Sequence, residues 1–167
     1  KDKSFRSVPL SNKNNVTAIC YDNDSNLYIG TTSGVEIIRN AKNGYYANIK
    51  SEPFGLLKNI NIISIYRASD GTMWFGTYGK GAFAYNPANK KMLQYTTSSP
   101  KPFRIGHNIV RAFTEDKNKN VIIGTGGSGL NILDENKHVC QSIKNQLNNQ
   151  FSLGSDVIYC FLMDEMH

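Results

Sequence analysis

The stretch Met73-Trp74-Phe75-Gly76-Thr77 decides the fold, because it has two relatives elsewhere in the chain. The relatives are Leu27-Tyr28-Ile29-Gly30-Thr31 and Val121-Ile122-Ile123-Gly124-Thr125. Upstream of each lies an asparagine followed by an apolar run. These anchors are Asn15, Asn61 and Asn108, and Asp156 opens a fourth copy. Because glycines and anchors recur at the same spacing, the chain contains an internal repeat of about 47 residues.

Each repeat has the residues of four short strands separated by polar turns. In the second repeat they are Ile62 to Arg67, the Gly-Thr strand, Ala82 to Tyr85 and Met92 to Tyr95. This pattern is typical of a β-propeller blade, and we expect the first strand of each blade to be buried on both faces. The third repeat has one residue more between anchor and glycine, which we assign to its turn. The sequence therefore predicts an all-β fold, a β-propeller fragment of about three four-stranded antiparallel blades with partial strands at both ends.

The repeat anchors also predict the limits of the blades. We expect residues 15–60, 61–107 and 108–155 to be three blades, residues 1–14 the outer strand of a preceding blade and residues 156–167 the first strand of a following one. Propellers close with about four to eight blades, so three cannot form a ring. We expect the remaining blades of the parent protein, or a second copy in a homodimer, to complete it.

Composition narrows the classes of partner. The 167 residues carry a net charge of +6, but the basic residues are scattered and form no basic helix, so we expect no nucleic-acid partner. The charge favours an acidic ligand. Cys20, Cys140 and Cys160 are too widely spaced for a disulfide framework or a metal site, and we expect buried, unreactive thiols.

Two motifs resemble ligand loops but are better explained as turns. Gly124 to Gly129 fits the G-x-G-x-x-G pattern of dinucleotide sites, yet the same hairpin recurs in the other repeats. Asp22 to Asn26 resembles the start of a calcium loop, but the later ligand positions are missing. Trp74 shares its register with Tyr28 and Ile122, which indicates a packing position. We predict no metal site, cofactor or catalytic residue.

The candidate ligand residues are large side chains near the first strands. Three residues after the anchors, the first two repeats have Ala18 and Ser64, whereas the later ones have Arg111 and Tyr159. First strands border the central channel of a propeller, so both side chains are expected at its lumen or mouth. The predicted ligand-binding residues are Arg111, Tyr159, Arg67, Tyr78 and Lys80.

The second repeat resembles the two-component regulator propeller repeat, in the residues Asn61, Asp70-Gly71, Trp74 to Thr77 and Tyr85-Asn86-Pro87. The resemblance implies the periplasmic sensor region of a hybrid two-component histidine kinase, anchored in the inner membrane and regulating glycan use. It further implies a glycan or oligosaccharide ligand and a segment that is not itself catalytic. Two alternatives are a propeller scaffold that binds proteins and part of a propeller polysaccharide lyase.

Overall fold

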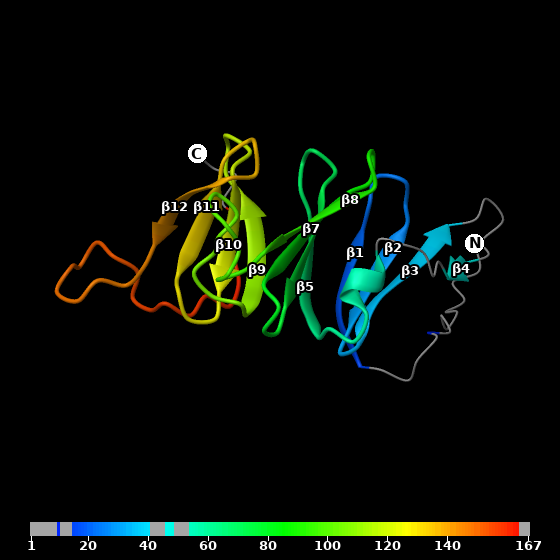
Figure 1. Cartoon of the computed structure of the whole chain (residues 1–167), viewed down its shortest axis with the longest axis horizontal. Helices are drawn as coiled ribbons and strands as arrows, with labels where there is room; N and C mark the ends of the chain where they lie inside the picture. The colour runs from blue at the N-terminus through cyan, green and yellow to red at the C-terminus, as the bar shows by residue number, and fades with distance from the viewer. Residues whose placement is uncertain (1–9, 11–14, 41–45, 49–53, 164–167) are drawn as a thin grey trace, which may run out of the picture.

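The computed structural model describes residues 10, 15–40, 46–48 and 54–163 and consists of three four-stranded antiparallel sheets. The sheets stand side by side along the long axis of the molecule, each built from consecutive strands (Figure 1). This is the arrangement of propeller blades, and it confirms the predicted fold class. No helix in the described residues is long and apolar enough to cross a membrane.

The strands have the following bounds. The first blade contains β1 (Val16–Tyr21), β2 (Leu27–Thr31), β3 (Gly34–Asn40) and β4 (Tyr46–Asn48). After the 3-10 helix η1 (Phe54–Leu57), the second contains β5 (Ile62–Arg67), β6 (Met73–Thr77), β7 (Ala82–Asn86) and β8 (Lys91–Tyr95). The third contains β9 (Val110–Glu115), β10 (Val121–Thr125), β11 (Leu130–Leu133) and β12 (Val139–Ile143).

The two partial strands have different outcomes. Residues 1–9 and 11–14, predicted as the outer strand of a preceding blade, lie outside the described residues. Residues 156–163 form no strand of their own, but Val157 pairs with Gly126 in an isolated antiparallel bridge. The predicted blade boundaries stay a prediction, since they fall in loops and the strand bounds do not test them.

The glycine of each Gly-Thr pair lies where the next blade comes closest. A Cβ added to Gly30 would lie 2.8 Å from Cγ2 of Ile62, and one added to Gly124 would lie 2.7 Å from Cγ2 of Ile158. On Gly76 it would collide with the Ser64 hydroxyl and the Val110 carbonyl oxygen. All three contacts are closer than a real Cβ tolerates. The repeated glycine therefore sets how near successive blades can pack.

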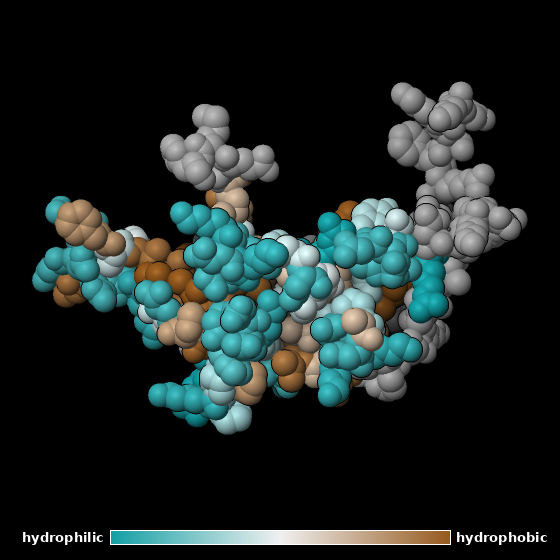
Figure 2. Space-filling model, turned by 90° about the horizontal axis from the view of Figure 1, so that it is seen from above, coloured by the Kyte–Doolittle hydropathy of each residue, from teal (hydrophilic) through white to brown (hydrophobic). Residues whose placement is uncertain are grey.

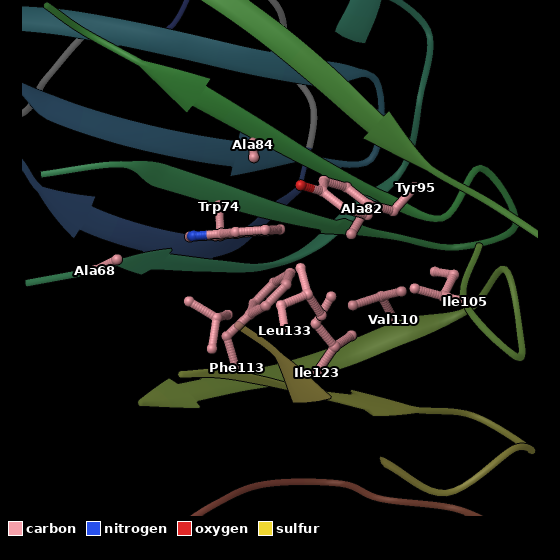
Figure 3. Close-up of a cluster of buried hydrophobic side chains, with 11 residues drawn as sticks. Ala68, Trp74, Ala82, Ala84, Tyr95, Ile105, Val110, Phe113, Ile123 and Leu133 are labelled. Carbon is pink, nitrogen blue, oxygen red and sulfur yellow. The ribbon is translucent and has the colours of Figure 1, made fainter. Parts of the chain in front are cut away.

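Two apolar clusters fill the spaces between blades. Trp74 is fully buried between the second and third sheets, with its ring centroid 5.3 Å from that of Tyr95 and 5.6 Å from that of Phe113. Figure 3 shows Trp74 and Tyr95 facing Phe113, Val110 and Leu133 across this space. The second cluster, between the first two sheets, contains Tyr28, Ile37, Leu57, Ile62, Met73, Phe75, Phe83 and Tyr85. The interpretation of Trp74 as a packing residue is confirmed.

Burial of the first strands increases along the chain. Most of β9 is buried and β5 is half-buried, but in β1 the side chains of Val16, Ile19 and Tyr21 are 51, 64 and 55% exposed. The prediction of burial on both faces was therefore wrong for β1 and β5. β9 lies between the second blade and residues 157–161, whereas β1 has no described blade on its outer side.

The prediction of buried thiols was also wrong for two of the three cysteines. Cys20 is partly buried, while Cys140 and Cys160 are exposed. Cys140 lies in β12, the edge strand of its sheet, and Cys160 lies in the final segment, beyond which no described strand packs.

Aspartates close the hairpins opposite the Gly-Thr loops. Asp22 Oδ1 accepts hydrogen bonds from the backbone N–H groups of Asp24 and Asn26, both at 2.9 Å. Asp116 repeats this arrangement with Asn118 at 2.8 Å and Asn120 at 2.9 Å. Such bonds to the backbone two residues onward stabilise tight turns. The carboxylate of Asp22 thus stabilises the turn of its own hairpin.

We expect Gly30→Ala to destabilise the fold by about 1–3 kcal/mol, because the added methyl forces Ile62 and the second blade outward. Gly154→Ala is the matched control, since an added Cβ there meets no atom within 4 Å. Urea denaturation of both variants would measure the difference. Equal midpoints would contradict the proposed role of the glycine.

Tyr66 predicts a pH dependence. Burial raises its pKa to about 12, and the Glu115 carboxylate, which accepts a hydrogen bond from the Tyr66 hydroxyl at 3.5 Å, adds to the increase. Since this pKa lies above that of an unfolded tyrosine, about 10, the stabilisation is complete below pH 10 and is lost as the pH rises toward 12. Tyr66→Phe should flatten the loss of stability in urea melts over this range, whereas Tyr78→Phe at an exposed position should not. Identical slopes in Tyr66→Phe and wild type would refute the assignment.

Candidate ligand site

The candidate site lies at one end of the sheets. We call this the connector end, defined by the first residues of β5 and β9, the last residues of β6 and β10, and the loops 78–81 and 126–129. In Figure 1 the first strands start at the lower edge of the molecule. The opposite end, with the turns 22–26, 68–72, 116–120 and 134–138, is called the hairpin end.

The loops at the connector end are shaped by the threonine of each Gly-Thr pair. The buried Thr77 hydroxyl donates to the Gly81 carbonyl at 2.7 Å and accepts the Lys80 N–H at 2.9 Å. Thr125 makes the same two bonds with Gly129 and Ser128, at 3.0 and 2.9 Å. The G-x-G-x-x-G stretch is therefore the turn that the repeat predicted.

Each of these loops is joined to the start of the next first strand. The Asn108 carbonyl oxygen accepts the N–H groups of Gly79 and Gly81 at 3.0 and 2.8 Å. One repeat later, the Asp156 carbonyl oxygen accepts the Gly129 N–H at 2.8 Å. Residues just past each anchor are thereby held against the loop of the preceding blade.

Arg111 and Tyr159, two of the predicted site residues, are in contact. The guanidinium carbon of Arg111 lies over the Tyr159 ring, 4.9 Å from its centroid, within the range of a cation–π interaction. The Tyr159 side chain is 71% exposed. The Nε atom of Arg111 is buried without a hydrogen-bond partner, and among the described residues no carboxylate forms an ion pair with this side chain. Adjacent repeats thus build one charged, aromatic surface.

The strand register corrects how Arg111 relates to the repeats. Gly124 pairs with Ala112, as Gly76 pairs with Ser64 and Gly30 with Ala18, so the three hairpins have equal length. The extra residue of the third repeat precedes β9 and is not in the turn as predicted. Arg111 therefore corresponds to Thr17 and Ile63, the residues that the strand pairing skips. At such a bulge the side chain departs from the regular alternation of the strand.

Two glycines in the loop after Thr125 leave room for the side chains of Arg111 and His107. A Cβ on Gly126 would lie 3.2 Å from Arg111 Nε, and one on Gly127 would lie 3.2 Å from the His107 ring. His107 Nδ1 accepts the Ile109 N–H at 3.0 Å, so in the neutral ring the proton resides on Nε2. Sequence reasoning missed His107 as part of this surface, because an isolated histidine carries no motif.

The other predicted residues lie in two different places. Tyr78, 60% exposed, pairs with Ile109 two residues before Arg111, and the exposed Lys80 follows in the same loop. Arg67 ends β5 opposite Met73 and lies at the hairpin end, about 16 Å from the start of its strand. The structure therefore brings Arg111 and Tyr159 together, places Tyr78 and Lys80 in the loop bonded to the residues just before β9, and separates Arg67. Ligand binding by these residues stays a prediction.

Two open grooves also escape sequence reasoning, because each forms where different blades or connectors meet. One, of about 290 Å³, crosses the hairpin end between the second and third blades, beside the 3.0 Å ion pair of Lys137 with Asp70. The other, of about 300 Å³, lies between the connector residues Lys101, Pro102 and Arg104 and the edge strand β12.

Repeated blades of this kind define a β-propeller, and comparison with known proteins identifies the repeat type. The family model for the two component regulator propeller matches residues 10–33 and 55–79, which include the first two Gly-Thr strands. Within these residues the chain carries two-component regulator propeller repeats, as the resemblance in sequence indicated.

Known relatives agree with this assignment. The chain is 40% identical to Histidine kinase P4 of Formosa agariphila over 81 residues, which are 46% of this chain and 6% of that protein. It superposes with 31% identity and a TM-score of 0.63 on the extracellular domain of a hybrid two component system from B. thetaiotaomicron, covering 84% of this chain and 17% of that one. The chain thus spans a small part of both relatives.

A lyase shares only the fold. Virginiamycin B lyase from Staphylococcus aureus superposes with a TM-score of 0.57 at 14% identity, over 84% of this chain and 46% of the lyase chain. At this identity the likeness says nothing about activity.

The threonine-centred loops yield a further prediction. Thr77→Val removes a buried hydroxyl that accepts the Lys80 N–H, and we expect a loss of about 1–3 kcal/mol in unfolding free energy. Thr32→Val, at an exposed threonine of the first blade, is the control and should leave stability within about 0.5 kcal/mol. A stable Thr77→Val variant would show that the loop does not depend on this hydroxyl.

Proposed function

We propose that this propeller segment lies in the extracytoplasmic, periplasmic sensory region of a hybrid two-component histidine kinase and takes part in sensing a glycan. The observation that carries the proposal is the 31% identity, over 84% of the chain, with the extracellular domain of a hybrid two component system. The match to a histidine kinase over 81 residues supports the same parent class. The parent protein would be anchored in the inner membrane.

The segment itself is proposed to be non-catalytic. His107 is the histidine nearest to Arg111 in the sequence, and its Nδ1 lone pair is occupied by the Ile109 N–H. This fixes a proton donor at Nε2 and leaves no free basic nitrogen in the neutral ring. Signalling would follow from differential binding, since a ligand shifts an equilibrium between receptor arrangements only when it prefers one of them.

A second candidate function is a scaffold that contacts protein. It is favoured by the connector from Lys144 to Ser155, which projects from the third blade in Figure 1 and exposes Leu147 and Phe151 to 89 and 90%. Two such side chains on one projecting segment favour a contact surface, because grouped exposed apolar residues are typical of interaction sites. The remaining blades of the parent protein, or a second copy in a homodimer, would supply the partner surface.

The location of the segment can be tested through Cys140, which is exposed on β12. In cells with a permeabilised outer membrane, a maleimide that cannot cross the inner membrane should label the Cys140 peptide of the parent protein, detected by mass spectrometry. Cys140→Ser provides the control for this peptide. Labelling that requires lysis of the inner membrane would contradict an extracytoplasmic location.

Glycan sensing is tested by calorimetric titration of the whole parent protein with neutral and acidic oligosaccharides. Binding by a member of either panel supports the proposal. Absence of heat with all members, together with recovery of a protein partner in a pull-down, would select the scaffold function instead.

A further inference from the structure

Charges are distributed unequally between the two ends of the sheets. All described Asp and Glu residues except Glu36 and Asp156 lie at the hairpin end, where they accompany a similar number of Lys and Arg residues. Figure 2 looks onto this end and shows mostly hydrophilic side chains. These acidic residues are Asp22, Asp24, Asp70, Glu115, Asp116, Asp134 and Glu135.

The groups that accept hydrogen bonds in the turns explain why the carboxylates gather at the hairpin end. At the hairpin end, carboxylates accept the backbone N–H groups of the turns, as Asp22, Asp116 and Asp134 do. At the connector end, the hydroxyls of Thr77 and Thr125 serve this purpose. The turns of these loops use no carboxylate, and the described basic side chains at this end form no ion pair.

Five of the described basic residues lie at the connector end. Lys58 precedes Asn59, whose N–H donates to the loop residue Ser33, and Arg104 pairs with Thr96 at the end of β8. Lys144 follows the residue that pairs with Leu130 at the start of β11. Lys80 and Arg111 complete the set. Asp156 is the one carboxylate described there, and its Oδ1 accepts the Asn145 N–H at 2.6 Å.

We propose that the connector end of the third blade binds the carboxylate or sulfate group of an acidic oligosaccharide, with Arg111 as the contacting residue. A guanidinium binds such groups through two parallel hydrogen bonds. Among the described residues, no carboxylate forms an ion pair with Arg111, and its buried Nε has no acceptor. The guanidinium charge is therefore available to an anionic ligand.

Tyr159 and Tyr78 add an aromatic component to the site. Tyr159 holds the guanidinium of Arg111 against its ring, so the arginine is ordered before ligand arrives. Both tyrosines are more than half exposed and can cover the apolar face of a sugar ring while their hydroxyls remain in water. The choice of a saccharide over other anions rests on the proposed sensory function, whereas the anion site rests on the geometry alone.

Titration of the whole parent protein tests the proposal, with trigalacturonate and a chondroitin sulfate tetrasaccharide as acidic probes. Fully methyl-esterified trigalacturonate, which keeps the sugar rings and loses the charge, is the neutral probe. We expect an acidic probe to bind at least tenfold more tightly than the neutral one, and less tightly as salt is raised. Arg111→Gln should weaken its binding about tenfold or more, and Arg111→Lys by less.

Matched variants exclude a general charge effect. Lys91→Gln, at the hairpin end, removes the same charge and should leave binding unchanged within twofold. Tyr159→Ala should weaken the binding of the acidic probe, because Arg111 loses the aromatic ring that orders its side chain.

The possible results separate this proposal from the sensory function. If a saccharide binds but Arg111→Gln has no effect, or if only the neutral probe binds, the anion site is overturned and the sensory function stands. If no saccharide binds, both are overturned. Equally tight, Arg111-dependent binding of a single-stranded oligonucleotide would overturn the choice of a saccharide.

Discussion

Close approach of a first strand to the glycine of the preceding blade is the contact on which the rest of the structure depends. At Gly30, Gly76 and Gly124 there is no space for even one further carbon atom. This approach brings Trp74 and Phe113 to within 5.6 Å between ring centroids and buries the large apolar residues of both sheets. It also lets the loops after Thr77 and Thr125 donate hydrogen bonds to the start of the next blade. Packing, loop geometry and the candidate site therefore share one requirement for a small residue.

The fold could be predicted from the sequence because its determinants are local and repeated. The Gly-Thr pair, the polar turns and the apolar runs each occur in a short stretch, and three copies reduce the chance of coincidence. The position of the extra residue in the third repeat could not be predicted this way, because Asn108 and Asn61 are aligned in sequence but differ by one position in register. Only the pairing of Gly124 with Ala112 reveals the difference.

The candidate site was predictable in part. Arg111 and Tyr159 were found because both are large residues in one register of the repeat, and they do meet. Arg67 was predicted at the same site but lies at the opposite end of the sheet, because residues that are close in sequence along one strand can lie at its two ends. His107 and the glycines around it were not recognised, since their importance comes from what they touch. The unequal distribution of charge between the two ends could not be predicted, because it depends on the register of every strand.

The contact between Arg111 and Tyr159 crosses the boundary between two repeats, and this has a consequence for how such a chain can evolve. Duplication or loss of one blade between other blades preserves the packing surfaces, because each blade presents the same glycine to the next. The same event at the boundary after β12 would separate the arginine from its tyrosine. The number of blades is then free to vary elsewhere in the protein, whereas these two repeats must be inherited together.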